Sequence, residues 1–223
     1  MSAKVTTINL GGVNCYLLQS EQGFVLIDTG FQTQRTLLER KLEEAGCKPG
    51  RLRLILMTHG DTDHVGNSAY LHQKYGAPTA IHAQDAPMVE QGNMGVNRKP
   101  KPDRMSLLFK LLTLFTKRLA EKHPLEKFKP DLLVDESFEL GTYGLEAKVL
   151  HIPGHSKGSI GVLTEEGDLF CGDMFYNMPG FRFVDDIQDR QGSVEKLKGM
   201  GIRRIYPGHG KPFLPTAQMK PHS

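Results

Sequence analysis

The chain has 223 residues, of which 39% are hydrophobic and 24% charged, and its formal net charge is +3. This composition excludes a wholly disordered chain, and the small net charge gives no argument for a nucleic-acid-binding protein. The length fits a single α/β domain, which we expect to span residues 1–223.

The N-terminal segment and the cysteines indicate where the protein resides. The first ten residues lack the basic start and apolar stretch of a secretory signal, and no apolar run approaches the ~20 residues of a transmembrane segment. Cys15, Cys47 and Cys171 are odd in number and widely spaced, which is typical of neither a disulfide framework nor a thiolate zinc site. These features predict a protein of the reducing cytoplasm.

Short apolar runs alternate with stretches of helical periodicity, which predicts a layered α/β fold. Up to residue 82 we expect strands over 14–18, 24–27, 52–57 and 79–82, and helices over 33–45 and 65–75. After residue 131 we expect strands over 137–140, 145–151, 158–164, 169–171 and 204–206, and a helix over 191–199.

An insert at about residues 91–131 separates these two halves. It carries 10 Lys or Arg against 4 Asp or Glu, so its charge is +6 and the rest of the chain is −3. A helix is expected over 103–122, with an apolar stripe that includes Leu108 and Leu111. This helix packs on the domain, or it forms a lid, a homodimer contact or a membrane-surface helix; the sequence leaves these alternatives open.

Four predicted strands are each followed by residues of the types that bind metal ions. Imidazole and carboxylate groups are ligands of zinc, iron and manganese in water-activating sites. Along the first segment His59, Asp61 and Asp63 alternate, so that an extended loop projects them to one side while His64 points elsewhere. The candidate ligands of two adjacent ions are His59, Asp61, Asp63, His64, His155, Asp173 and His209.

Two further residues are of interest near these ligands. Asp28 follows a predicted strand, where it can accept a hydrogen bond from a metal-binding histidine or simply occupy a turn. Tyr176 follows Asp173 closely, where it can line a substrate pocket and donate to a developing oxyanion, or pack in the core.

The motifs resemble those of the metallo-β-lactamase superfamily, which has a His-x-His-x-Asp-His loop followed by a distant His, a bridging Asp and a last His. The resemblance covers roughly residues 14–213 and implies a four-layer αββα sandwich with its metals at one edge. It also implies how the ligands are shared: His59, Asp61 and His155 for the first ion, Asp63, His64 and His209 for the second, and Asp173 between them. Asp63 and Asp173 are then also the expected catalytic carboxylates.

The chain departs from this motif at its second histidine, where it has Asp61. If Asp61 coordinates, three carboxylates leave two divalent ions with a formal charge of +1, which favours iron or manganese beside zinc. If it does not coordinate, the first site is weak and the protein binds one ion.

The resemblance implies a metal-dependent hydrolase of a small ester, lactone or thioester, with two divalent ions, zinc above all, as cofactors and no nucleic-acid partner. An iron-dependent redox or oxygen-handling protein is a second possibility, because flavodiiron proteins resemble this chain in having a carboxylate, Glu, at the position of Asp61. A binding protein with a degenerate site is the third.

Overall fold

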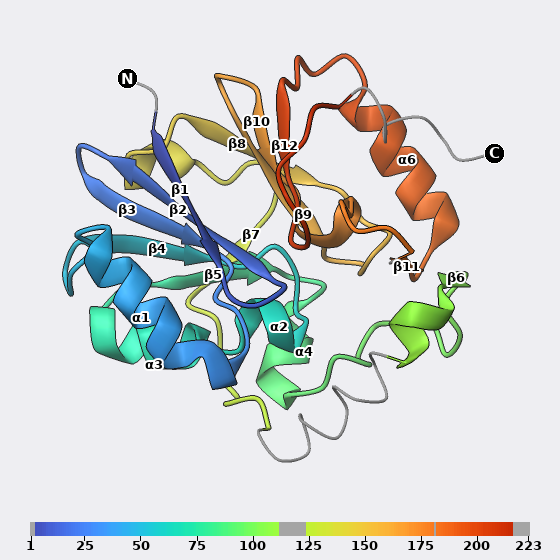
Figure 1. Cartoon of the computed structure of the whole chain (residues 1–223), viewed down its shortest axis with the longest axis horizontal. Helices are drawn as coiled ribbons and strands as arrows, with labels where there is room; N and C mark the ends of the chain where they lie inside the picture. The colour runs from blue at the N-terminus through green and yellow to red at the C-terminus, as the bar shows by residue number, and fades with distance from the viewer. Residues whose placement is uncertain (1–2, 112–123, 181, 216–223) are drawn as a thin grey trace.

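The computed structural model describes residues 3–111, 124–180 and 182–215. Two β-sheets face one another in its centre, and helices cover their outer faces (Figure 1). This arrangement confirms the predicted four-layer αββα sandwich with a helical insert. That residues 1–223 form one domain stays a prediction.

The first sheet has six strands in the order β1-β2-β3-β4-β5-β7. β1 and β2 pair antiparallel with their neighbours, whereas β3, β4, β5 and β7 run parallel. The bounds are Lys4–Asn9 (β1), Asn14–Ser20 (β2), Gly23–Ile27 (β3), Leu52–Leu56 (β4), Thr79–His82 (β5) and Leu132–Val134 (β7).

The second sheet has the order β12-β10-β9-β8, and a separate two-stranded ribbon joins β11 to β6. The strands of the second sheet are Ala147–His151 (β8), Ile160–Thr164 (β9), Asp168–Phe170 (β10) and Arg204–Tyr206 (β12). The ribbon pairs Arg104–Met105 (β6) from the insert with Phe183–Val184 (β11) from the C-terminal half, in antiparallel orientation.

The helices enclose three layers of hydrophobic core. They are Arg35–Glu44 (α1), Thr62–Val65 (α2), Ser68–Tyr75 (α3), Ala86–Gln91 (α4) and Ile187–Leu197 (α6). Along β2, Cys15 and Leu17 contact the core beneath α1 and α3, whereas Tyr16 and Leu18 face the core between the sheets. Because alternate side chains of a strand point to opposite faces, one apolar strand serves both layers.

Several sequence predictions are wrong in detail. Residues 137–140, expected as a strand, contain only the bridge of Glu139 to Lys148 and the start of the 3₁₀ turn Leu140–Tyr143 (η2). β1 and β7 were not expected. The helix predicted over 65–75 is interrupted between α2 and α3. At this break the Asn67 side chain donates hydrogen bonds to the backbone oxygens of Thr29 and Phe31.

The insert also differs from its prediction. Residues 104–105, expected in a helix, form β6, because they pair with β11. Helical structure begins at residue 107, and the part of the expected helix over 112–122 lies outside the described residues. Leu108 and Leu111 of the expected apolar stripe are exposed by 50% and 58%, so at these positions the helix does not pack on the domain. Among the described residues, no helix has the length and apolar character needed to cross a membrane.

Candidate metal centre

The seven predicted ligands converge at one edge of the sandwich, where four strands end. His59 follows β4, His155 follows β8, and His209 follows β12. Asp173 lies in the 3₁₀ turn Gly172–Met174 (η3) after β10, and Asp61, Asp63 and His64 lie at the start of α2. Strands of facing sheets that end at the same edge can therefore gather residues distant in sequence.

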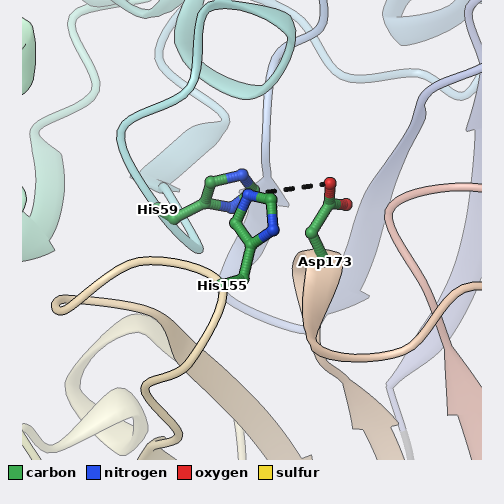
Figure 2. Close-up of side chains that lie close together, drawn as sticks. All are labelled: His59, His155 and Asp173. Carbon is green, nitrogen blue, oxygen red and sulfur yellow. Dashed lines mark ion pairs between the residues drawn. The ribbon is translucent and has the colours of Figure 1, made fainter. Parts of the chain in front are cut away.

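Two groups of side chains each bring three possible ligand atoms within 4.8 Å of one another. The first ligand group is His59, His155 and Asp173, and the second ligand group is Asp63, His64 and His209. Figure 2 shows the two imidazoles and the carboxylate of the first group turned toward one another, with the pair of His155 and Asp173 marked.

Asp173 lies between the two groups. Its Oδ2 atom is 3.8 Å from Nε2 of His155 and 3.4 Å from Nε2 of His209, while its Oδ1 atom is 3.3 Å from Nε2 of His64. Two ligand atoms of one tetrahedral zinc ion lie about 3.3 Å apart when each is about 2.0 Å from the ion. The separations around Asp173 therefore suit a carboxylate shared by two ions.

Each of the four histidines is anchored through Nδ1. Nδ1 of His64 donates to Asp28 at 2.8 Å, and Nδ1 of His209 donates to the backbone oxygen of Gly12 at 2.8 Å. Nδ1 of His59 lies 3.0 Å from Oγ1 of Thr58, and Nδ1 of His155 lies 2.9 Å from the hydroxyl of Tyr176. These contacts leave Nε2 of each ring directed to the centre, as metal-binding histidines require.

These residues fit a metal ion. Among the described side chains, three buried polar atoms have no hydrogen-bond partner: Nε2 of His59, Nε2 of His64 and Oδ1 of Asp173. A buried polar atom without a partner costs about 1–3 kcal/mol, so such atoms are rare unless a ligand satisfies them. All three atoms belong to residues of the two ligand groups.

Asp61 stands beside the first ligand group and is paired with a residue of the insert. Its Oδ2 atom is 2.9 Å from Nε2 of His155 and 3.5 Å from Nε2 of His59. Its Oδ1 atom accepts from Arg98 at 2.6 Å. Arg98 also donates to the backbone oxygen of His155 at 2.8 Å, and its guanidinium lies 5.0 Å over the ring of Phe183.

The electrostatics of the first group depend on this guanidinium. Burial by itself would raise the pKa of Asp61, but Arg98, followed by His155, holds it well below the usual value. Burial and the neighbouring His59 lower the pKa of His155, which favours the neutral ring that binds metals. Sequence reasoning did not single out Arg98, because a basic residue in a basic insert has no distinguishing local pattern.

In the second ligand group, nearby carboxylates outweigh burial in setting the pKa values of the histidines. Burial alone would lower the pKa of His64, but Asp28, Asp173 and Asp63 outweigh it and raise the pKa well above the usual value. Burial is likewise outweighed at His209, where Asp173 and Asp63 raise the pKa to about 10. The position of Asp28 confirms the expectation that it orients a histidine of the centre.

Glycines allow the ligand loops to approach one another. A Cβ atom on Gly208 would lie 2.3 Å from Oδ1 of Asp173, and one on Gly172 would lie 2.4 Å from Oγ1 of Thr58. Gly172 also has a φ of +49°, a backbone conformation that residues other than glycine rarely adopt. At both positions the absence of a side chain therefore lets the backbone lie close to the ligand loops.

Asp85 is a second residue that sequence reasoning missed. It is 1% exposed and accepts from N of Gly60 at 3.1 Å, from Oγ of Ser156 at 2.6 Å and from N of Gly158 at 2.8 Å. One buried carboxylate therefore joins the loop of His59 to the loop of His155. Its partners on the second loop lie about 70 residues away in sequence, so no local motif indicates this role.

The chain matches known proteins in both sequence and fold. The sequence model of the metallo-beta-lactamase superfamily matches residues 8–209. The chain belongs to this superfamily. Its fold is similar to that of the metallo-beta-lactamase family protein TTHA1429 from Thermus thermophilus, with a TM-score of 0.71 at 24% identity over 96% of this chain and 75% of that one.

Two further relatives bear on the site. TTHA1623, solved in a di-iron-bound form, is 26% identical to this chain, with a TM-score of 0.66. The match covers 95% of this chain and 94% of TTHA1623. The hydroxyacylglutathione hydrolase GloC of Haemophilus influenzae is 27% identical over 79% of this chain and 73% of its own length. The expectation of a family that contains metal-dependent hydrolases is confirmed.

Some relatives are longer than this chain. The beta-lactamase-like protein 2 homolog of Drosophila melanogaster is 27% identical over 92% of this chain, but the match spans 61% of that protein. The homolog of Caenorhabditis elegans is matched over 57% of its length.

Proposed function

We propose that this protein is a metal-dependent hydrolase that cleaves a small ester, lactone or thioester. The convergence of the seven ligand residues, with four Nε2 atoms directed inward, carries the proposal. Relatives support it, since they include a probable metallo-hydrolase of Methanocaldococcus jannaschii, 27% identical over 89% of this chain, and the hydrolase GloC, a thioester hydrolase.

We assign the ligands as the motif implies. His59, Asp61 and His155 would hold the first ion, Asp63, His64 and His209 would hold the second, and Asp173 lies between the two groups where both could use it. Bound ions would lower the pKa of a water molecule and polarise the substrate carbonyl. Zinc suits these ligands, and the di-iron-bound form of TTHA1623 supports testing iron as well.

Asp63 is the carboxylate best placed to act on the reacting groups. Its side chain is 20% exposed, against 16% for Asp61 and 4% for Asp173. Burial would raise its pKa, but His64 and His209 outweigh this and lower it, so the carboxylate is ionised at neutral pH. Asp63 is therefore the carboxylate that we expect to orient the nucleophile, while Asp173 positions both ligand groups.

Tyr176 is held in a positioning role. Its hydroxyl contacts Nδ1 of His155, and burial, with Asp173 next, raises the pKa of this phenol well above its usual value. The group therefore remains a neutral hydroxyl that fixes the ring of His155. A cytoplasmic location is also part of the proposal, because Cys15, Cys47 and Cys171 are all buried free thiols.

The test combines metal analysis with substrate turnover. Protein purified without added metal is analysed for zinc, iron and manganese, then assayed with lactones, aryl esters and thioesters after each metal is restored. Asp173→Ala is expected to lose most bound metal and to reduce turnover by about a thousandfold or more, since it contacts both groups.

The exposed loop residue Glu166 supplies a matched control, and Glu166→Ala is expected to leave metal content and turnover unchanged. Turnover that Asp173→Ala retains in full would contradict the proposal. Oxygen consumption by the iron form without ester cleavage would favour the redox alternative, and metal binding without any turnover would favour the degenerate binding protein.

A further inference from the structure

A cavity of about 450 Å³ lies next to the metal centre, between α6 and the β6–β11 ribbon. Tyr176 and Phe183 line the cavity and also contact His155 of the first ligand group. The hydroxyl of Tyr176 is 2.9 Å from Nδ1 of His155, and the Phe183 ring meets the imidazole edge-on at 5.2 Å between centroids. The two aromatic rings thus line the cavity on the side of the metal ligands.

The ribbon and the helix both place arginines on this cavity. Arg104 of β6 pairs with Val184 of β11, and Arg182 lies two residues before Val184, so the three side chains share one face of the ribbon. On α6, Ile187, Arg190 and Val194 recur at helical spacing and also line the cavity. The lining therefore combines apolar side chains with three guanidinium groups.

Within the described part of the chain, these three arginines form no ion pair with a carboxylate. Among the described residues, no ion pair joins Arg104, Arg182 or Arg190 to an acid, whereas Lys198 at the cavity rim pairs with Glu195 at 2.6 Å. Arg190 is half-buried, whereas Arg104 and Arg182 are exposed. Two other half-buried arginines are paired: Arg35 with Glu126 at 3.0 Å and Arg98 with Asp61 at 2.6 Å.

The pKa of Arg190 is affected by the two arginines near it. Its guanidinium donates to the backbone oxygen of Met174 at 3.2 Å and lies 5.7 Å from the centroid of the Phe175 ring. Burial lowers its pKa, and the like charges of Arg104 and Arg182 lower it further. Positive charge is therefore concentrated at this cavity, where the one acid among the lining residues, Glu195, is already paired with Lys198.

We propose that this arginine cavity, formed by Arg104, Arg182, Arg190 and the apolar side chains between them, binds the anionic end of the substrate. The anionic group is a carboxylate or a phosphate, whose oxygens match the planar fork of a guanidinium. Val184, Ile187 and Val194 contact the apolar chain next to this group. The inference rests on the proposed hydrolase function, and it makes the substrate an ester or thioester with an acidic tail.

Binding is tested on zinc-loaded protein by calorimetric titration with hexanoate, hexyl phosphate and the neutral hexanol. At least one acid is expected to bind more tightly than hexanol, and the tighter of the two acids identifies the tail as carboxylate or phosphate. Arg182→Gln and Arg190→Gln are each expected to weaken acid binding about tenfold or more, while the exposed Arg40→Gln on α1 leaves it unchanged.

Arg182 is exposed, so its substitution tests the cavity without disturbing the packing of Arg190 on Phe175. Acid binding that persists undiminished in both cavity variants would place the anion at the metal ions instead and would overturn the proposal. Equal affinity for the acids and for hexanol, or no acid binding at millimolar concentration, would do the same.

Measurements of ester turnover distinguish the proposed arginine cavity from the proposed hydrolase function. For phenyl hexanoate and the monophenyl ester of hexanedioic acid, Arg182→Gln is expected to raise KM about tenfold for the acidic ester alone, with kcat little changed. Cleavage of both esters with identical KM in wild type and variant would remove the cavity assignment and leave the hydrolase. Arginine-dependent hexanoate binding without cleavage of either ester would remove the hydrolase and leave the cavity.

Discussion

In the first ligand group the adjacent carboxylate, Asp61, is paired with the guanidinium of Arg98 as well as with His155, whereas in the second group the carboxylates are paired with imidazoles. Burial and His59 lower the pKa of His155, whereas the carboxylates of the second group outweigh burial and raise the pKa values of His64 and His209. The first group thus has a permanent compensating charge from the insert. In the second group the carboxylates favour positive charge on the histidines, and a bound cation would supply that charge instead.

This difference changes the charge balance expected from the sequence. With Asp61, Asp63 and Asp173 as carboxylates, two divalent ions retain a formal +1, as the sequence indicates. Arg98, in contact with Asp61, adds one positive charge and brings the centre to +2. Asp61 together with Arg98 therefore has the net charge of the neutral histidine that the superfamily motif has at this position.

The largest effect is expected from breaking the Asp61 and Arg98 pair at one side. Asp61→His leaves a guanidinium that is 10% exposed without its carboxylate, so we expect a loss of about 3 kcal/mol of stability and weaker metal binding in the first group. The double variant Asp61→His with Arg98→Met is expected to recover both. Thermal unfolding and metal stoichiometry, measured on both variants, check this.

The comparison of the two variants is decisive because each alternative predicts a different pattern. If Arg98 compensates Asp61, the effects of the two substitutions are strongly non-additive. Equal stability and equal metal content of Asp61→His in the presence and absence of Arg98 would show that the pair has no such role. Arg40→Met on α1 serves as a matched surface control.

A smaller effect, confined to the second group, is expected from Asp28→Asn. The substitution removes the negative charge that orients His64 through Nδ1 at 2.8 Å, and support of this kind is worth about ten- to a hundredfold in metal affinity. Competition titration with a chelator should therefore show one weakened and one unchanged ion. Equal weakening of both ions would contradict the independence of the two groups.

The smallest effect is expected at Asp131, which lies outside both ligand groups and is held mainly by hydrogen bonds from Thr79, with His72 at 3.2 Å. Burial would raise the pKa of Asp131, but N and Oγ1 of Thr79 donate to it at 2.7 Å each and lower it. Asp131→Asn is expected to cost about 0.5–1 kcal/mol at pH 7, since the carboxylate is partly exposed, and to leave metal content unchanged.

The pH dependence of this cost has a definite sign. A lowered pKa in the folded state stabilises the protein above the ordinary pKa of about 4, and this contribution disappears as the pH falls through the lowered value. Denaturant unfolding of wild type and Asp131→Asn should therefore differ at pH 7 and converge in acid. A difference that grows on acidification would contradict this account of Asp131.

The ligands of the candidate centre could be predicted because each lies beside a strand end and within a short motif. The strands β2, β3, β4 and β5 and the helix α1 were also predictable, since their apolar spacing is local. β6 and β7 were missed because they are two and three residues long and exist only through pairing with β11 and β5. The role of Asp85 was not predicted, because its hydrogen-bond partners lie on two loops distant from it in sequence.

The sequence by itself determined the superfamily, the layered fold and the seven candidate ligands, because these depend on residue types at fixed short spacings. Only the tertiary structure decided that Arg98 compensates Asp61, and that Arg104, Arg182 and Arg190 face one cavity. Charge acts through space, so the partner of a buried ion is set by how the insert folds against the sheets rather than by its position along the chain.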